Sequence, residues 1–80
     1  MNVVKNGSTG SSVIACQAIL KAYGFVGKDG KPLDVDGVSG ENTVYAINSF
    51  QSLTKSTGVN TGNCDGVFGA KCWEYVFGGD

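Results

Sequence analysis

The sequence has no histidine, one proline, one tryptophan and an odd number of cysteines, three in 80 residues. Without histidine, the usual general base, the Ser-His-Asp and Cys-His arrangements and the commonest zinc ligand are missing. With three cysteines, at least one thiol is unpaired within the chain, so a full disulfide framework is not the basis of the fold. These absences argue against a hydrolytic enzyme and against a disulfide scaffold.

The charge and hydrophobicity of the sequence argue against nucleic acid and membranes as partners. The formal net charge is −1 and the basic residues form no cluster, whereas a phosphate-backbone binder needs grouped Lys and Arg. The chain has no apolar run long enough to span a bilayer, and residues 1–5 lack the apolar core of a signal peptide. We therefore expect no nucleic-acid or membrane partner, in a domain that is either cytoplasmic when made or cut from a longer chain.

Eighty residues are enough for one small domain, and we treat residues 1–80 as a single unit. A chain of this length buries only about 60% of its unfolded surface. Its core stabilises the fold by only about 3–5 kcal/mol. A catalytic cleft with its own supporting residues would be difficult to accommodate.

Glycine is abundant, with 13 copies, and six of them form a repeated pattern. Gly-x-x-Gly occurs at residues 7–10, 37–40 and 66–69, and the last two copies follow Asp36 and Asp65. A first glycine suits a tight turn because it reaches positive φ without a Cβ clash, and the aspartate can bond the N–H groups of that turn. The second glycine stands at the expected N-cap of a helix, so one unit of turn, cap and helix is used three times.

Apolar spacing predicts helices over residues 11–23, 41–53 and 70–77. The fold class is therefore all-α, a small three-helix bundle with long loops and room for one or two very short extended segments around residues 33–36. Residues 55–63 are polar and are predicted to form a surface loop. The predicted buried positions are Val13, Cys16, Leu20 and Tyr23 in the first helix, Thr43, Ala46, Ile47 and Phe50 in the second, and Trp73, Val76 and Phe77 in the third.

Carboxylates near the turns invite a test for calcium. Aligning an EF-hand loop on Gly37 puts Thr43 at its last ligand position, and aligning it on Gly66 puts Cys72 there. Neither is the bidentate glutamate that the loop requires, so we expect no metal and no other cofactor. Cys64 and Cys72 flank the third turn and could form a disulfide, although reduced thiols are the simpler interpretation.

A binding surface remains the best functional hypothesis. The second helix carries an uncharged polar set, Asn42, Tyr45, Asn48 and Gln51, that suits a neutral ligand rich in hydroxyl and amide groups. Tyrosine adds a flat apolar face with a polar tip. For Tyr45 and Trp73 the alternative is that each simply covers the small core. Ile14 and Ala18 lie on a further helix face, either exposed singly or in contact with a partner.

Taken together, these residues resemble the peptidoglycan-binding domain of bacterial cell-wall hydrolases and phage endolysins. Its pattern looks like G-x-x-G-x-x-V-x-x-L-Q-x-x-L-x-x-x-G-[YF], then twice a segment beginning D-G-x-x-G-x-x-T. The matching residues are Gly7, Gly10, Val13, Cys16, Gln17, Leu20, Gly24 and Phe25, then Asp36, Gly37, Gly40, Thr43, Ala46, Ile47, Phe50 and Gln51, then Asp65, Gly66, Gly69, Cys72, Trp73 and Val76. Cys16 stands in place of leucine and Cys72 in place of threonine.

The resemblance implies a non-catalytic module that holds peptidoglycan, by its glycan or its stem peptide, and so targets a hydrolase domain of the parent chain. It implies a location at the cell wall or outside the cell, or in the cytoplasm until lysis if the chain is phage-encoded. The candidate ligand-binding residues are Asp36, Asn42, Tyr45, Asn48 and Trp73. The alternative is a protein-interaction or pro-segment domain that packs on a partner enzyme, since the fold also resembles part of the pro-region of matrix metalloproteinases.

Overall fold

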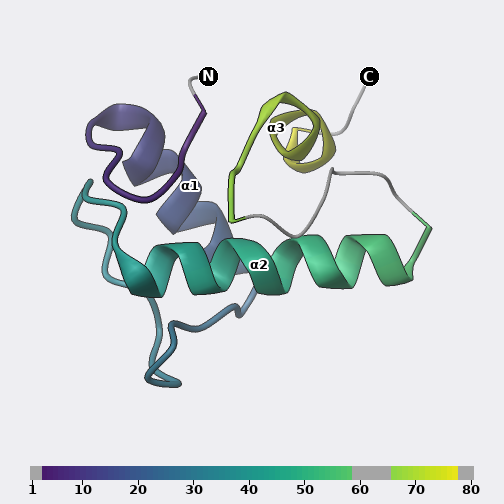
Figure 1. Ribbon diagram of the computed structural model, residues 1–80, viewed down its shortest axis with the longest axis horizontal. Coiled ribbons are helices and arrows are strands. Elements are labelled where there is room, and N and C mark those ends of the chain that lie inside the picture. Colours follow the sequence, from purple (N-terminus) through teal and green to yellow (C-terminus); the bar gives the residue numbers. More distant parts are fainter. Residues whose placement is uncertain (1–2, 59–65, 78–80) are drawn as a thin grey trace.

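The computed structural model describes residues 3–58 and 66–77. That part of the chain folds into three helices, α1 (Ser11–Ala22), α2 (Glu41–Ser56) and α3 (Ala70–Val76), and its β-pairing is limited to isolated bridges. In Figure 1, α2 runs across the molecule and α1 and α3 lie above it. The all-α class predicted from the sequence is confirmed.

Each helix begins where the glycine pattern predicts it. The N-caps are Gly10, Gly40 and Gly69, the second glycines of the three pairs. The first glycines all have positive φ, between 74° and 89°, which a residue with a Cβ rarely adopts. In the second turn, the Oδ1 atom of Asp36 accepts a hydrogen bond of 3.0 Å from the Val38 N–H. The predicted unit of turn, cap and helix is therefore confirmed.

The segment before α1 forms backbone hydrogen bonds with the turns that precede α2 and α3. The backbone of Val4 pairs with that of Phe68 through hydrogen bonds of 2.8 and 3.2 Å. Further along, the Gly7 N–H donates to the Ser39 carbonyl and the Ser39 N–H donates to the Ser8 carbonyl, both at 2.8 Å. The Val4 side chain is fully buried. Sequence reasoning missed this segment, because its pairing partners lie far away in the chain.

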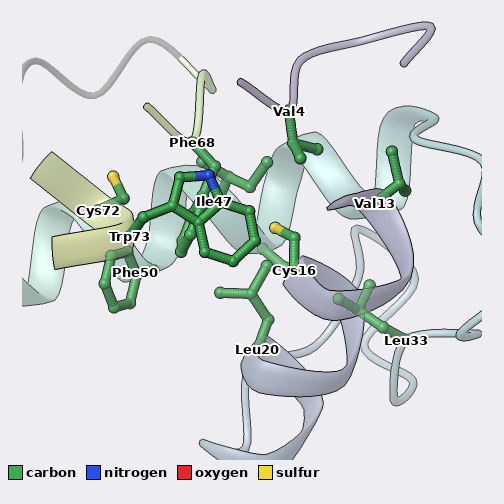
Figure 2. Packing of buried hydrophobic residues seen from close by; sticks show 11 residues of the cluster. Val4, Val13, Cys16, Leu20, Leu33, Ile47, Phe50, Phe68, Cys72 and Trp73 are labelled. Carbon is green, nitrogen blue, oxygen red and sulfur yellow. The ribbon is translucent and has the colours of Figure 1, made fainter. Parts of the chain in front are cut away.

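The core lies between the three helices, and the rings of Phe50, Phe68 and Trp73 pack there among aliphatic and cysteine side chains (Figure 2). Phe50 of α2 is 1% exposed and lies within 6.4 Å, between ring centroids, of four other aromatic rings. Figure 2 shows the Trp73 indole in the middle of the cluster, between Phe50 on one side and Cys16 and Leu20 on the other. Burial raises the pKa of the Cys16 thiol to about 12, and the neighbouring Cys72 adds to the shift. The thiol is therefore a packing group at neutral pH.

One helix end and two aromatic side chains differ from the sequence-based expectation. Phe77, predicted to be buried, is the C-cap of α3 and is 60% exposed. α2 continues to Ser56, three residues further than predicted, because Thr54 is buried and holds its last turn against the core. Lys55 is consequently helical and does not belong to a loop. Tyr23 is the C-cap of α1 and is 52% exposed, so it does not extend the buried stripe of that helix. The Cys64–Cys72 disulfide, considered above as the alternative to reduced thiols, involves a residue outside the described part of the chain.

Candidate ligand-binding surface

A buried glutamine of α1 positions the turn before α2. Gln17 is 1% exposed, and its Oε1 accepts the N–H groups of Asp36 and Gly37 at 3.1 and 3.0 Å. Its Nε2 donates to the Asp36 carboxylate and the Val38 carbonyl at 3.0 Å and to the Thr43 hydroxyl at 3.1 Å. One amide therefore satisfies both the backbone of the turn and the first turn of the helix that follows.

A second buried glutamine has the same role before α3. The Oε1 of Gln51 accepts the Gly66 N–H at 3.3 Å, and its Nε2 donates to the Val67 carbonyl at 2.8 Å. The Nε2 also approaches the Cys72 sulfur at 3.8 Å. Gln51 is 1% exposed, so it does not belong to the exposed polar set of α2 with which the sequence analysis grouped it. Its polarity serves the fold, because a buried turn needs partners for its N–H and C=O groups.

Asp36 and Asn42 line one hollow of about 260 Å³ beside the start of α2. The pKa of Asp36 is lowered, because its carboxylate accepts hydrogen bonds from the Val38 N–H and then from the Gln17 amide. The Oδ1 of Asn42 accepts the Lys28 N–H at 3.0 Å, which ties the loop after α1 to α2. Lys28 also forms an exposed ion pair with Glu41. Both predicted residues are thus held in place and remain exposed at the surface.

Tyr45, Asn48 and Leu53 line a second, shallower hollow of about 670 Å³. The Tyr45 side chain is 46% exposed and that of Leu53 is 54% exposed. Three serines complete the lining, Ser49, Ser52 and Ser56. This surface combines an accessible aromatic ring with amide and hydroxyl groups, and its lining contains no carboxylate or amine.

Asn48 is only partly available in this hollow. Its Oδ1 atom is buried and has no hydrogen-bond partner among the described residues. The same amide lies close to Gly66, where an added Cβ would come within 3.7 Å of it. Asn48 therefore packs partly against the third turn, and its remaining surface faces the hollow.

Trp73 lies apart from the other four predicted residues. It is 5% exposed, packs edge-on against Phe68 at 4.7 Å and stacks on Phe77 at 5.7 Å. The structure places Asp36 and Asn42 in one hollow at the start of α2, and Tyr45 and Asn48 in another along the same helix. Trp73 belongs to the core and offers a ligand almost no surface.

The sequence reading left the serines and Leu53 out of the candidate set. Tyr45, Ser49, Ser52 and Ser56 follow helical spacing, which places them on one face. Small polar residues at that spacing are a signal that could have been used. Ser56 was also lost because the helix was predicted to end before it.

The described residues contain no cluster of three or more Cys, Asp or Glu able to hold a metal ion. Among the same residues, none of the three helices has the length and apolar character that crossing a bilayer requires. Ile14 is 47% exposed, and its side chain lies against the second turn, since a Cβ on Gly37 would meet it at 3.2 Å.

Sequence and structure comparisons identify the family. Residues 9–74 match the family described as "Putative peptidoglycan binding domain". The match covers most of the 80 residues, so the chain belongs to this family and is a peptidoglycan-binding module. A search of curated proteins gives no match.

Solved structures agree with this assignment. The N-terminal domain of SleB superposes with a TM-score of 0.74 and 32% identity, over 98% of this chain and 92% of that one. A Clostridioides difficile peptidoglycan-binding protein in complex with glutamine hydroxamate has a TM-score of 0.71 and 28% identity, over 94% of this chain and 40% of that one. A Burkholderia AP3 phage endolysin gives 0.71 and 28%, over 99% of this chain and 26% of that one.

Proposed function

We propose that the chain holds peptidoglycan on the outer side of α2, with the Tyr45 hollow as the main contact. The observation that carries this proposal is the composition of the hollow. It pairs a half-exposed ring with amide and hydroxyl groups and lacks charged groups in its lining. A tyrosine ring packs its flat face on apolar surface while its hydroxyl stays hydrogen-bonded. A neutral polymer with both C–H faces and hydroxyl or amide groups fits such a surface.

The smaller hollow extends this contact surface at the start of α2. Asn42 precedes Tyr45 by three residues on α2, and Asp36 lies in the same hollow as Asn42. The Oδ1 of Asn42 is already engaged by Lys28, so a ligand would meet its Nδ2 group. The Asp36 carboxylate would accept hydrogen bonds from amide or hydroxyl groups of the wall polymer.

The module acts by tethering and performs no chemistry of its own. It has no histidine, and its buried cysteine Cys16 has a pKa raised to about 12, so that thiol is a poor nucleophile at neutral pH. Attached to a hydrolase domain, such a module keeps the enzyme at high effective concentration on an insoluble substrate. The place of action is then the bacterial cell wall.

Co-sedimentation with purified sacculi tests the binding surface. Tyr45→Ala should weaken binding about tenfold, since a central aromatic contact carries about 1–2 kcal/mol. Phe77→Ala is the matched control, because Phe77 is a 60% exposed aromatic residue that lines neither hollow. Equal losses in both variants would argue against this surface. A wild-type domain that stays in the supernatant would argue against wall binding itself.

A fusion tests the tethering role. Joined to a muramidase catalytic domain, the wild-type module should raise the rate on intact sacculi and leave the rate on soluble glycan fragments unchanged. The Tyr45→Ala fusion should lose the gain on sacculi. The module alone should release no reducing ends, and any release above a buffer control would contradict a purely binding role.

A further inference from the structure

The Tyr45 hollow lies on one face of a single helix. Its lining residues follow helical spacing along one stripe of α2: Tyr45, Asn48, Ser49, Ser52, Leu53 and Ser56. Residues three or four apart on a helix are surface neighbours, with about 5–6 Å between their Cβ atoms. Ser49 therefore lies between Tyr45 and Leu53, four residues from each. A ligand that lies along this stripe meets an aromatic ring, a hydroxyl group and an aliphatic side chain in that order.

Two serines of the hollow act as hydrogen-bond acceptors towards a ligand. The Ser49 hydroxyl donates its proton to the Tyr45 carbonyl at 3.1 Å, and the Ser56 hydroxyl donates to the Leu53 carbonyl at 2.7 Å. A hydroxyl group has one proton and two lone pairs, so each of these Oγ atoms has only acceptor capacity left. The hollow therefore offers oxygen acceptors to the N–H or O–H groups of a ligand.

Asn48 supplies a donor beside Ser49. Its Oδ1 atom is buried while the residue lines the hollow, so Nδ2 is the end of this amide that a ligand can reach. The NH2 group donates to carbonyl oxygens. Asn48 and Ser49 together match a ligand group that contains both a C=O and an N–H, which is the hydrogen-bonding pattern of an amide.

The described residues that line the hollow are all uncharged. A ligand carboxylate would meet no amine or guanidinium in this lining, and a ligand ammonium would meet no carboxylate. Either ion would lose hydration without gaining an ion pair, so the lining favours a neutral amide. Leu53 is 54% exposed and adds an aliphatic contact beside Ser49, which suits a methyl group attached to that amide.

We infer that the Tyr45 hollow recognises the acetamido group of N-acetylated sugars, so that the module binds the glycan of the wall through its N-acetyl groups. This inference rests on the proposed function and names the chemical group that the same hollow selects. The sugar ring packs on the Tyr45 ring. The acetamido N–H donates to Ser49 Oγ and its carbonyl accepts from Asn48 Nδ2, while its methyl group contacts Leu53. Removal of the acetyl group deletes the last two contacts and creates an ammonium group that the uncharged lining does not balance.

Three tetrasaccharides with a common backbone separate the acetamido group from the sugar ring and from charge. The tetrasaccharides of N-acetylglucosamine, glucosamine and glucose carry an acetamido, an ammonium and a hydroxyl group on the same ring carbon. In NMR titrations, the wild-type domain should bind the first about tenfold more tightly than the other two, which lack the carbonyl hydrogen bond and the methyl contact. Equal affinities for the first and the third would overturn the inference, because binding would then depend on the sugar ring alone.

Leu53→Ala removes the aliphatic contact of the acetyl methyl group, at a half-exposed position where alanine is a good helix former. The variant should bind the N-acetylglucosamine tetrasaccharide about fourfold more weakly, the factor that corresponds to burial of one methyl group. Its affinity for the glucose tetrasaccharide should not change. Val35→Ala, at an exposed aliphatic residue outside the hollow, is the matched control and should keep both affinities. Equal losses for the two tetrasaccharides in Leu53→Ala would overturn the inference.

A measurement on the wild-type protein covers the case in which the variant does not fold. The bound N-acetylglucosamine tetrasaccharide should show nuclear Overhauser contacts between its acetyl methyl protons and the Leu53 methyl protons. The absence of these contacts at saturating sugar, or binding of sacculi without binding of any of the three tetrasaccharides, would overturn the inference and leave wall binding in place. A domain that binds neither sacculi nor tetrasaccharides would overturn both proposals.

Discussion

In both the turn before α2 and the turn before α3, a buried glutamine side chain hydrogen-bonds the backbone. The two turns differ in the acceptor that the glutamine amide meets in the following helix, and in the space around the first glycine. In the first, the Gln17 amide meets a hydroxyl oxygen, Thr43 Oγ1, at 3.1 Å. In the second, the Gln51 amide meets a sulfur, Cys72 Sγ, at 3.8 Å. Sulfur is a weak acceptor. The feature common to both repeats is therefore a buried glutamine amide that hydrogen-bonds the turn. The atom of the following helix that accepts from this amide can be either oxygen or sulfur.

The two turns also differ in the space available for a side chain at the first glycine, and here the turn before α3 is the more constrained. A Cβ added at Gly37 would come within 3.2 Å of the Ile14 Cγ1, in a side chain that is 47% exposed and can move aside. At Gly66 it would come within 2.7 Å of Val44 Cγ1. Valine is β-branched and stiff at χ1. The turn before α3 thus has the weaker hydrogen-bond acceptor and leaves less space for a Cβ at its first glycine.

The largest expected loss of stability comes from replacing Gln17, the glutamine whose amide meets the stronger acceptor. Gln17→Leu leaves the N–H groups of Asp36 and Gly37 without their acceptor, which should cost about 3 kcal/mol or more, close to the whole stability of a domain of this size. Urea unfolding followed by circular dichroism measures the loss. Ala18→Leu, at an exposed position of the same helix, should change stability by less than about 0.5 kcal/mol. A Gln17→Leu variant as stable as the wild type would refute the role of the amide.

The glycine comparison predicts the next largest effect. Gly66→Ala should cost about 3 kcal/mol, from positive φ and the contact with Val44, while Gly37→Ala should cost about 1–2 kcal/mol from φ alone. Thermal unfolding of both variants gives the difference. Adding Val44→Ala to Gly66→Ala should recover part of the loss. Equal costs at the two glycines would show that the space around them does not matter.

Exchanging the two acceptors should have a smaller effect. Cys72→Thr should stabilise the domain by about 0.5 kcal/mol, because a hydroxyl oxygen replaces sulfur opposite the Gln51 amide. Thr43→Cys should destabilise it by about the same amount. The two residues have similar helix propensity, so that term cancels. The pair of variants is compared by denaturant midpoint, and the hypothesis fails if both exchanges change stability in the same direction.

The smallest expected effect is the contribution of the Asp36 carboxylate to the stability of the domain at low pH. Because the pKa of Asp36 is lowered in the fold, its ionised form stabilises the domain at pH values above its ordinary range, near 4, and the contribution is lost as the pH falls below that range. Asp36→Asn should therefore show a shallower decline of Tm between pH 5 and 2 than the wild type. Asp34→Asn removes a carboxyl from the same loop and controls for net charge. Identical curves for both variants would contradict a specific role for Asp36.

The exposed surface of α2 was largely predictable from the sequence, whereas the exposure of Tyr23 was not. Asn42 and Tyr45 stand opposite the buried stripe of their helix, and helical periodicity alone assigns them to the outside. Tyr23 follows the stripe of α1 by the same periodicity and was predicted to be buried. It is exposed because α1 ends before it, at a boundary that depends on how Gly24 and Phe25 redirect the chain.

The sequence by itself determined the number of helices, their first residues and the glycine turns that precede them, because these depend on local backbone sterics and on apolar spacing within one helix. Tertiary structure alone decided the burial of the two glutamines and distinguished between the two roles considered for Trp73. Gln17, Gln51 and Trp73 have chemistry that suits a binding site, but each finds its partners in another element. A polar group is buried when a distant segment supplies its hydrogen bonds, and such a partner is not visible in the local sequence.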